Sequence, residues 1–176
     1  MSLISINSKF RQDPYHRYKM QPVLIKTVNR GQYGTTTILN MKEISNSLHH
    51  PEEILFKFIS YDLATSCDVK KGTITGAYTI NIVQDSIDKY INNFILCVTC
   101  SVPEIDPEIE GKKKKIKCNM HCAACGSTNK LISVDKAVDK TIKLIIKELQ
   151  SSRVWRKHSK NYDQVELCDD FDNFGF

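Results

Sequence analysis

The sequence lacks any apolar run that could cross a membrane. None of its stretches approaches the roughly 18 apolar residues that a membrane helix needs. Residues 1–10 also lack the apolar core of a signal peptide. The seven cysteines are an odd number, which fits a reducing compartment with one metal site better than a disulfide framework. We therefore expect a cytosolic or nuclear protein, most simply cytoplasmic, with no membrane partner.

Motifs for nucleotide binding and for nucleophilic catalysis are also absent. There is no Gly-x-x-x-x-Gly-Lys-Ser/Thr loop, and residues 31–35, which come nearest, are too short and contain no lysine. No arrangement of Ser, His and Asp suggests a triad, and the pair His49-His50 has no evident metal partner. We expect a protein that is not an enzyme and holds no nucleotide of its own.

The charge of the chain is unevenly distributed. Of 176 residues, 41% are hydrophobic and 26% are charged, as in ordinary globular proteins, and the formal net charge is +5. Residues 1–60 carry 8 basic and 4 acidic side chains, and residues 131–160 carry 8 basic and 3 acidic ones. Residues 161–176 carry 5 acidic side chains and no basic one. The basic body favours RNA or another phosphate-rich partner, although solvated lysines explain the same count.

Four cysteines in two pairs are the most informative motif. They are Cys97-Val-Thr-Cys100 and Cys122-Ala-Ala-Cys125, with 21 residues between the pairs. A Cys-x-x-Cys turn directs two thiolates at one ion, and two such turns form a tetrahedral zinc site. A redox dithiol is the alternative, but two pairs at this spacing favour zinc. Four thiolates leave no position for an activated water, so we expect one structural Zn²⁺.

Two neighbouring residues are candidates for a competing ligand. Cys118 precedes Cys122 by four residues, and His121 is adjacent to it. Neither is needed to complete the set of four.

Periodicity and turn residues predict an α+β fold: a small mixed α/β domain followed by a C4 zinc ribbon, a C-terminal helix and a flexible acidic-aromatic tail. The expected boundaries are a flexible N-terminal arm at 1–21, the α+β domain at 22–96, the ribbon at 97–132, the helix at 133–150 and the tail at 151–176. Within the domain we expect a hairpin of strands 23–28 and 35–40, a helix at 42–48, strands at 54–59 and 73–79, and a helix at 83–95. Either Ser133 or Asp135 is expected to cap the last helix.

The ordered set of motifs resembles the N-terminal domain of eukaryotic translation initiation factor 5, a fold shared with the beta subunit of initiation factor 2. The resemblance covers about residues 13–135 and is most specific in Tyr15-His16-Arg17-Tyr18-Lys19-Met20. It continues through Thr37-Ile38-Leu39-Asn40-Met41, Pro51, Lys57, Gly76, Phe94-Ile95-Leu96-Cys97-x-x-Cys100 and Cys122-x-Ala-Cys125-Gly126.

This resemblance implies a function in trans. In the family an arginine of the arm promotes GTP hydrolysis on initiation factor 2 at the start codon, and the matching residue is Arg17. A supporting basic residue matches Lys57, which we expect on the face of a strand opposite Phe56 and Phe58. The implied partners are initiation factor 2 (its gamma subunit GTPase and its beta subunit), initiator tRNA and the small ribosomal subunit, and we expect a monomer. Resemblance and charge together indicate RNA contacts at Lys26, Arg30, Lys112, Lys113, Lys114 and Lys115.

The chain also departs from the family pattern. Thr35 and His50 stand where the family has basic residues, and Arg30 is a candidate to replace the first of these charges. The family's C-terminal helical-repeat domain has no counterpart here, so one hypothesis is that the acidic-aromatic residues 161–176 take its place. The alternative is a solubilising end.

Three other interpretations stay open at this point. A structural subunit like the beta subunit of initiation factor 2 would need an N-terminal helix, which the polar arm with Pro14 does not favour. A binding-only mimic of factor 5 would occupy its place without activating hydrolysis. A transcription-type zinc ribbon would explain the ribbon and the charge but not the arm.

Overall fold

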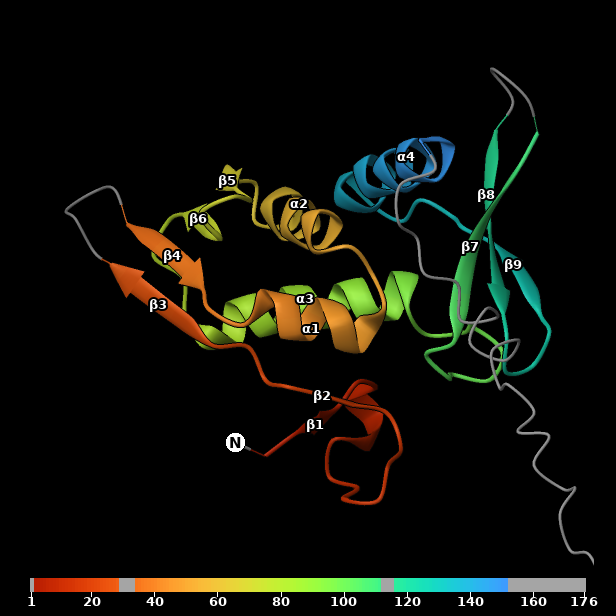
Figure 1. Cartoon of the computed structure of the whole chain (residues 1–176), viewed down its shortest axis with the longest axis horizontal. Coiled ribbons are helices and arrows are strands. Elements are labelled where there is room, and N and C mark those ends of the chain that lie inside the picture. The colour runs from red at the N-terminus through yellow and green to blue at the C-terminus, as the bar shows by residue number, and fades with distance from the viewer. Residues whose placement is uncertain (1, 29–33, 112–115, 152–176) are drawn as a thin grey trace, which may run out of the picture.

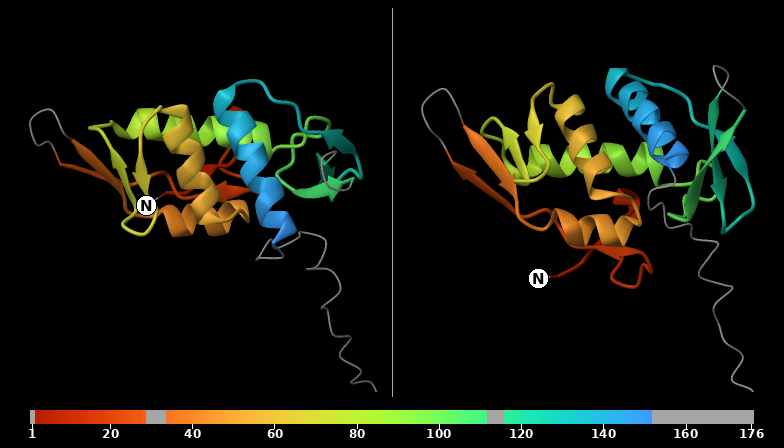
Figure 2. Two further views of the ribbon diagram at one scale, coloured as in Figure 1. Left: turned by 90° about the horizontal axis from the view of Figure 1, so that it is seen from above. Right: turned by 45° about the horizontal axis from the view of Figure 1, so that its top comes forward.

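A computed structural model of the chain describes residues 2–28, 34–111 and 116–151. Figure 1 shows a four-stranded sheet at one end, helices in the middle and a three-stranded sheet at the other end. The two views in Figure 2 keep this order. The predictions for Arg30, Lys112, Lys113, Lys114, Lys115 and the tail beyond residue 151 lie outside the described residues.

The four-stranded sheet contains β3 (Ile25–Val28), β4 (Thr35–Ile38), β6 (Thr73–Thr75) and β5 (Cys67–Asp68), antiparallel in that order. The predicted hairpin is therefore confirmed. The strand expected at 73–79 ends at Thr75, because Gly76 has φ +120 and the ring of Tyr78 lies where a β-carbon would stand. The buried Thr36 Oγ1 fixes this bend by donating to the Gly76 carbonyl at 2.8 Å and accepting from the Tyr78 amide at 3.0 Å.

Three helices pack against the sheet and one another. They are α1 (Met41–Leu48), α2 (Glu52–Asp62) and α3 (Ile80–Phe94). The apolar face of α3 is buried, and Tyr90 and Phe94 both make edge-to-face contacts with Phe58 of α2. The predictions of α1 and α3 are confirmed.

The strand expected at 54–59 is wrong, because these residues lie within α2. The apolar run suits a buried strand or a buried helix equally by periodicity, and only the flanks differ. Pro51 is the N-cap residue just before the helix, and Glu52 and Glu53 place negative charge in the first turn, where the helix dipole favours it. Lys57 is thus a helical residue and not a residue on the open face of a strand.

The second sheet contains β7 (Ile105–Glu110), β8 (Lys117–Cys122) and β9 (Thr128–Lys130), all antiparallel. The last helix, α4 (Lys136–Gln150), is capped by Asp135, whose carboxylate accepts from the Val138 amide at 2.8 Å. It packs on both α2 and β7, so it joins the ribbon to the helical core. Val134, within the helix expected at 133–150, precedes α4 and is 77% exposed.

The N-terminal segment differs from the flexible arm that we expected. Residues 2–20, called the arm below, contain β1 (Ile4–Ser5), a 3-10 turn at Ser8–Phe10 and β2 (Lys19–Met20). Met20 is fully buried and Ile6 is 3% exposed, and β2 packs against α1 (Figure 1). Ile6 and Met20 form no periodic pattern in this polar stretch, so their burial comes from contacts with distant parts of the chain and could not be predicted locally.

Within the described part of the chain, no helix combines the length and the apolar character that a membrane crossing requires.

Candidate metal centre and the surface of the arm

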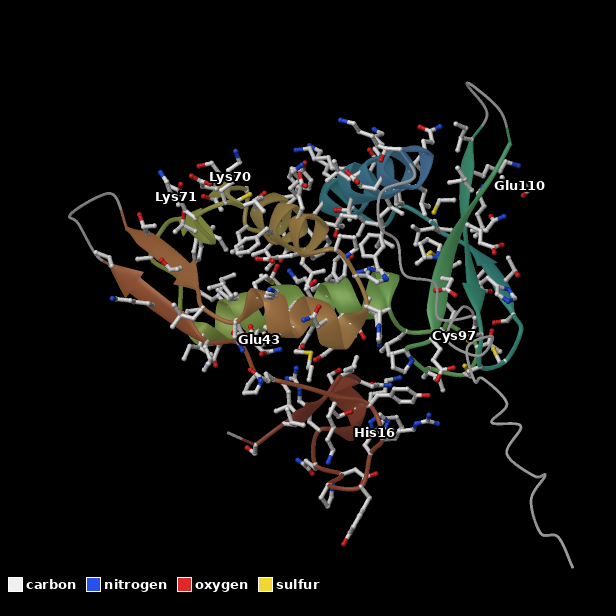
Figure 3. All side chains as sticks on the ribbon, viewed as in Figure 1. His16, Glu43, Lys70, Lys71, Cys97 and Glu110 are labelled. Atoms are coloured by element: carbon white, nitrogen blue, oxygen red, sulfur yellow. The ribbon has the colours of Figure 1, made fainter. Side chains whose placement is uncertain are left out.

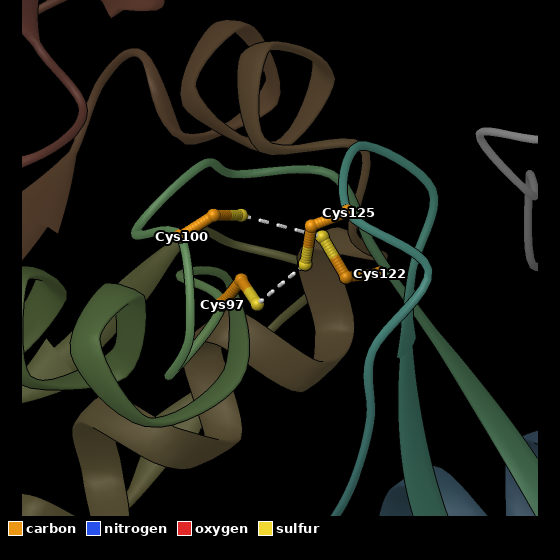
Figure 4. A group of neighbouring side chains, drawn as sticks. All are labelled: Cys97, Cys100, Cys122 and Cys125. Atoms are coloured by element: carbon orange, nitrogen blue, oxygen red, sulfur yellow. Dashed lines mark hydrogen bonds between the residues drawn. The ribbon is translucent and has the colours of Figure 1, made fainter.

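The four predicted cysteines converge at one point. The loop after α3 supplies Cys97 and Cys100, the last residue of β8 is Cys122, and the turn that follows supplies Cys125 (Figure 4). Their Sγ atoms all lie within 4.8 Å of one another. The Sγ–Sγ distances of Cys97–Cys125 and Cys100–Cys122 are both 3.7 Å. The S–S bond of a disulfide is about 2.05 Å long, whereas the sulfurs of a tetrahedral site with Zn–S bonds of about 2.3 Å lie about 3.8 Å apart. The set therefore fits Zn²⁺.

Hydrogen bonding prepares two of the thiols for ionisation. Burial opposes ionisation of Cys97, but hydrogen bonds from Ser127 Oγ at 3.3 Å and from backbone amides outweigh it and lower its pKa to about 6. The same hydroxyl, 3.1 Å from Cys125, lowers the pKa of that thiol. Burial raises the pKa of Cys100 and raises that of Cys122 to about 12. A metal that binds all four as thiolates would displace the remaining protons.

The two competing ligands do not join this cluster. Cys118 faces Ile109 across the β7–β8 pair and is buried, and burial raises its pKa to about 11. The Nδ1 atom of His121 lies 3.1 Å from Thr128 Oγ1. Among the described residues, the only grouping of metal-ligating side chains is the set of four cysteines.

Arg17 lies on the loop of the arm between the 3-10 turn and β2, and its side chain is exposed. Its guanidinium carbon stands 5.4 Å from the centre of the Tyr18 ring. In residues 2–28, 34–111 and 116–151 we find no carboxylate paired with it. Next to it, Tyr15 is 93% exposed, and its amide donates to Asp13 Oδ1 at 2.9 Å. The loop thus presents a free cation on a folded support.

Side-chain contacts hold the loop in place. Ser5 Oγ and His16 Nδ1 are 2.8 Å apart, and the His16 ring stacks on Phe10 with centroids 4.8 Å apart. Arg11 forms a salt bridge with Asp88 of α3. Figure 3 labels His16 within this loop.

Two further contacts join the arm to the ribbon. The Tyr18 hydroxyl donates to the Glu104 carboxylate, and the Asn7 amide donates to the Ser101 carbonyl at 3.5 Å. Both ribbon residues belong to the segment that connects Cys100 with β7. The arm therefore lies against one half of the metal centre.

Lys57 is not close to Arg17 in this arrangement. It forms an ion pair with Glu53 one turn earlier on α2, and this hydrogen bond raises its pKa. Figure 1 shows α2 on one side of α1 and α3 and the arm on the other. The structure thus separates the two residues that the resemblance associates with GTP hydrolysis.

Lys26, which we expect to contact RNA, and the two positions that depart from the family's basic pattern lie in different environments. Lys26 is exposed on β3, opposite Thr37 of β4. Thr35 is exposed at the start of β4. His50 is 3% exposed, and its Nδ1 lies 2.7 Å from the Tyr90 hydroxyl in the core. The departure from the family pattern at His50 therefore lies in the core and not on the surface.

One charged surface was not predicted from the sequence. Four exposed lysines of α4 recur at intervals of four, three and four residues: Lys136, Lys140, Lys143 and Lys147. This spacing places them in one stripe along the helix. Lys143 pairs with Asp139 at 2.7 Å, and Lys140 lies 5.0 Å from the centre of the Tyr61 ring. Reading charge with the helical period, as we read apolar residues, would have found the stripe.

Comparison with known proteins gives consistent matches. The sequence model of the domain found in initiation factors 2B and 5 matches residues 8–128. Eukaryotic translation initiation factor 5 of Saccharomyces cerevisiae is 32% identical over 128 residues, which is 70% of this chain and 31% of the relative. The factor 5 of Caenorhabditis elegans is 34% identical over 118 residues, 65% of this chain and 26% of the relative. The probable factor 5-2 of Arabidopsis thaliana is 30% identical over 147 residues, which is 81% of this chain and 33% of the relative. The chain thus spans about a third or less of these relatives.

Proposed function

Because the chain belongs to the family of the domain found in initiation factors 2B and 5, we propose that it acts like translation initiation factor 5. It stimulates GTP hydrolysis by initiation factor 2 bound to initiator tRNA on the small ribosomal subunit. The proposed partners are the gamma and beta subunits of that factor in the cytoplasm. The chain supplies a residue to another protein's nucleotide site and needs no catalytic site of its own.

The observation that carries this proposal is the exposed guanidinium of Arg17 on a folded loop, with no carboxylate partner in the described part of the chain. Phosphoryl transfer spreads negative charge over the γ-phosphate oxygens, and an arginine delivered from a second protein stabilises that charge. The cation must be permanent and planar, which excludes lysine as an equal substitute. Had Arg17 been buried in an internal ion pair, it could not have reached a second protein.

The zinc centre supports the same function indirectly. Zn²⁺ held by Cys97, Cys100, Cys122 and Cys125 would fix the ribbon, whose own hydrophobic core is small. The ribbon in turn contacts the arm that bears Arg17. The exposed Lys26 and the stripe on α4 are candidates for contacts with RNA phosphates.

Single-turnover GTP hydrolysis by reconstituted initiation complexes tests the proposal. Arg17→Ala should slow the stimulated rate by about 10³-fold or more, the usual effect of removing such an arginine. Arg17→Lys should recover little of the loss. Lys9→Ala, which removes another exposed cation of the arm, is the matched control and should retain the wild-type rate. Equal rates for wild type and Arg17→Ala would reject the assignment.

A binding-only mimic of factor 5 is the second candidate. Two family basic positions are neutral or buried here, Thr35 and His50, and this observation favours it. The same assay distinguishes the two functions. A mimic would bind the initiation complex, compete with authentic factor 5 and leave the rate of hydrolysis unstimulated.

A further inference from the structure

We propose that Tyr18 and Glu104 are positioning residues that couple the metal centre to Arg17. The inference rests on the proposed function, since it assigns a role to the residues that hold its arginine. The ribbon would then do more than stabilise the fold: it would set where the guanidinium stands.

On the ribbon side, Glu104 is fixed by both halves of the metal centre. Its carbonyl accepts from the Ala123 amide, next to Cys122, at 2.8 Å. The segment before it is folded back on the first cysteine, because the Ser101 amide donates to the Cys97 carbonyl at 2.8 Å. Ser101 takes a positive φ of 59 to make this turn, a conformation that non-glycine residues adopt only when the surroundings hold them there.

On the arm side, Tyr18 is the residue that touches both the ribbon and Arg17. Its carbonyl accepts from the Ile6 amide at 3.0 Å, which joins the residue before β2 to the residue after β1. Its hydroxyl donates to the Glu104 carboxylate. The centre of its ring lies 5.4 Å from the guanidinium carbon of Arg17. A bond from a phenol to a carboxylate is charge-assisted and directional. The chain of contacts therefore runs from the cysteine loops through Glu104 and Tyr18 to Arg17.

Among the described residues, few other contacts join this loop directly to the ribbon. The β1–β2 pair joins only two residue pairs, Ile4 with Met20 and Ser5 with Lys19. The Arg11–Asp88 bridge ties the opposite side of the loop to α3. The Asn7–Ser101 contact, at 3.5 Å, is at the limit of a hydrogen bond. A displacement of about 1 Å at a reacting group can lower the rate about 10²-fold. Loss of the Tyr18–Glu104 hydrogen bond is therefore expected to have a measurable effect on hydrolysis.

The test compares Tyr18→Phe, Glu104→Ala and the double variant in the full zinc-loaded chain. Tyr18→Phe removes the hydroxyl and keeps the ring next to Arg17, and Glu104→Ala removes the acceptor of that hydroxyl. Matched controls are Tyr15→Phe, which removes an exposed hydroxyl three residues away, and Glu43→Ala on α1, labelled in Figure 3. Single-turnover GTP hydrolysis should slow about tenfold in each single variant and no further in the double variant. Both controls should retain the wild-type rate.

A second readout does not depend on hydrolysis. Hydrogen exchange of residues 11–20 should accelerate in Tyr18→Phe while its zinc content stays at the wild-type value, and it should accelerate in the wild type when zinc is chelated. Unchanged exchange in Tyr18→Phe, or effects of the single variants that multiply in the double variant, would overturn the coupling. If Arg17→Ala leaves hydrolysis unchanged, the proposed function fails, and the exchange experiment still decides whether the ribbon positions the loop.

Discussion

The arm and the ribbon each contain a hairpin, but the two hairpins are stabilised by different means. The β1–β2 pair of the arm has two residue pairs in register, and its anchors are Met20 in the core and a few side-chain bonds. The β7–β8 pair of the ribbon has six residue pairs, and four cysteines converge at its end. The ribbon is therefore expected to depend on a metal, and the arm to depend on the body of the protein.

The largest expected effect is on the ribbon. Cys122→Ser, or a chelator, should unfold the ribbon and leave much of α1, α2 and α3 folded, because structural zinc contributes about 10 kcal/mol or more where the surrounding core is small. Hydrogen exchange should show lost protection in β7, β8 and β9. Cys67→Ser, outside the cluster, is the control. Metal analysis should give one zinc per chain, and a chain without zinc would contradict the ribbon assignment.

The arm should respond to a core substitution instead. Met20→Ala removes a fully buried side chain and should lower the free energy of unfolding by about 2–5 kcal/mol, while the zinc content stays unchanged. Urea denaturation measures the loss. Tyr15→Ala, at an exposed position of the same arm, should change stability by less than about 0.5 kcal/mol. Equal losses in the two variants would mean that the arm is not anchored by Met20.

Alkaline pH should weaken the ribbon through Cys118. Its thiol keeps its proton in the folded state up to a pKa of about 11, whereas in the unfolded state it loses it near a pKa of about 8.5. The unfolded state thus binds fewer protons between these values, and stability falls by up to about 1.4 kcal/mol per pH unit as pH rises. Below this window the contribution is constant. Cys118→Ala should flatten the curve of unfolding free energy against pH between about pH 8.5 and 10, and an unchanged slope would contradict this role of Cys118.

The smallest expected effect concerns the salt bridge between the arm and α3. The Arg11 side chain is 32% exposed, so Arg11→Ala should cost less than about 1 kcal/mol in unfolding experiments. The loss should shrink in high salt because the pair is partly screened. A loss of several kcal/mol would show that the bridge, and not Met20, is the main anchor of the arm.

Patterns local in sequence were sufficient for part of this fold. The four cysteines converge as their spacing predicted, and the stripe of α3 and the β3–β4 hairpin follow from periodicity and turn residues. The helix α2 did not follow, because an apolar run interrupted only by Lys57 suits a buried strand and a buried helix equally by periodicity. The error moved Lys57 from a strand to a helix that carries its own counter-ion, Glu53.

Features that depend on contacts between distant segments were beyond the sequence. The sequence of the arm is polar and without a period, and its folded conformation depends on partners far along the chain, such as Asp88 and Glu104. The burial of His50 likewise depends on Tyr90, forty residues later. The motif around Arg17 drew attention to this loop, but nothing local indicated that Tyr18 would bond to the ribbon.

The way α4 spans two modules has a practical consequence for protein engineering. The match to the family ends at residue 128, yet Ala137, Val138 and Ile145 bury their side chains beyond that point. An expression fragment trimmed to the matched region would leave the apolar flank of α2 open to water and prone to self-association. The smallest autonomous folding unit therefore extends at least to Gln150, and minimal fragments of close relatives should be designed with the same extension.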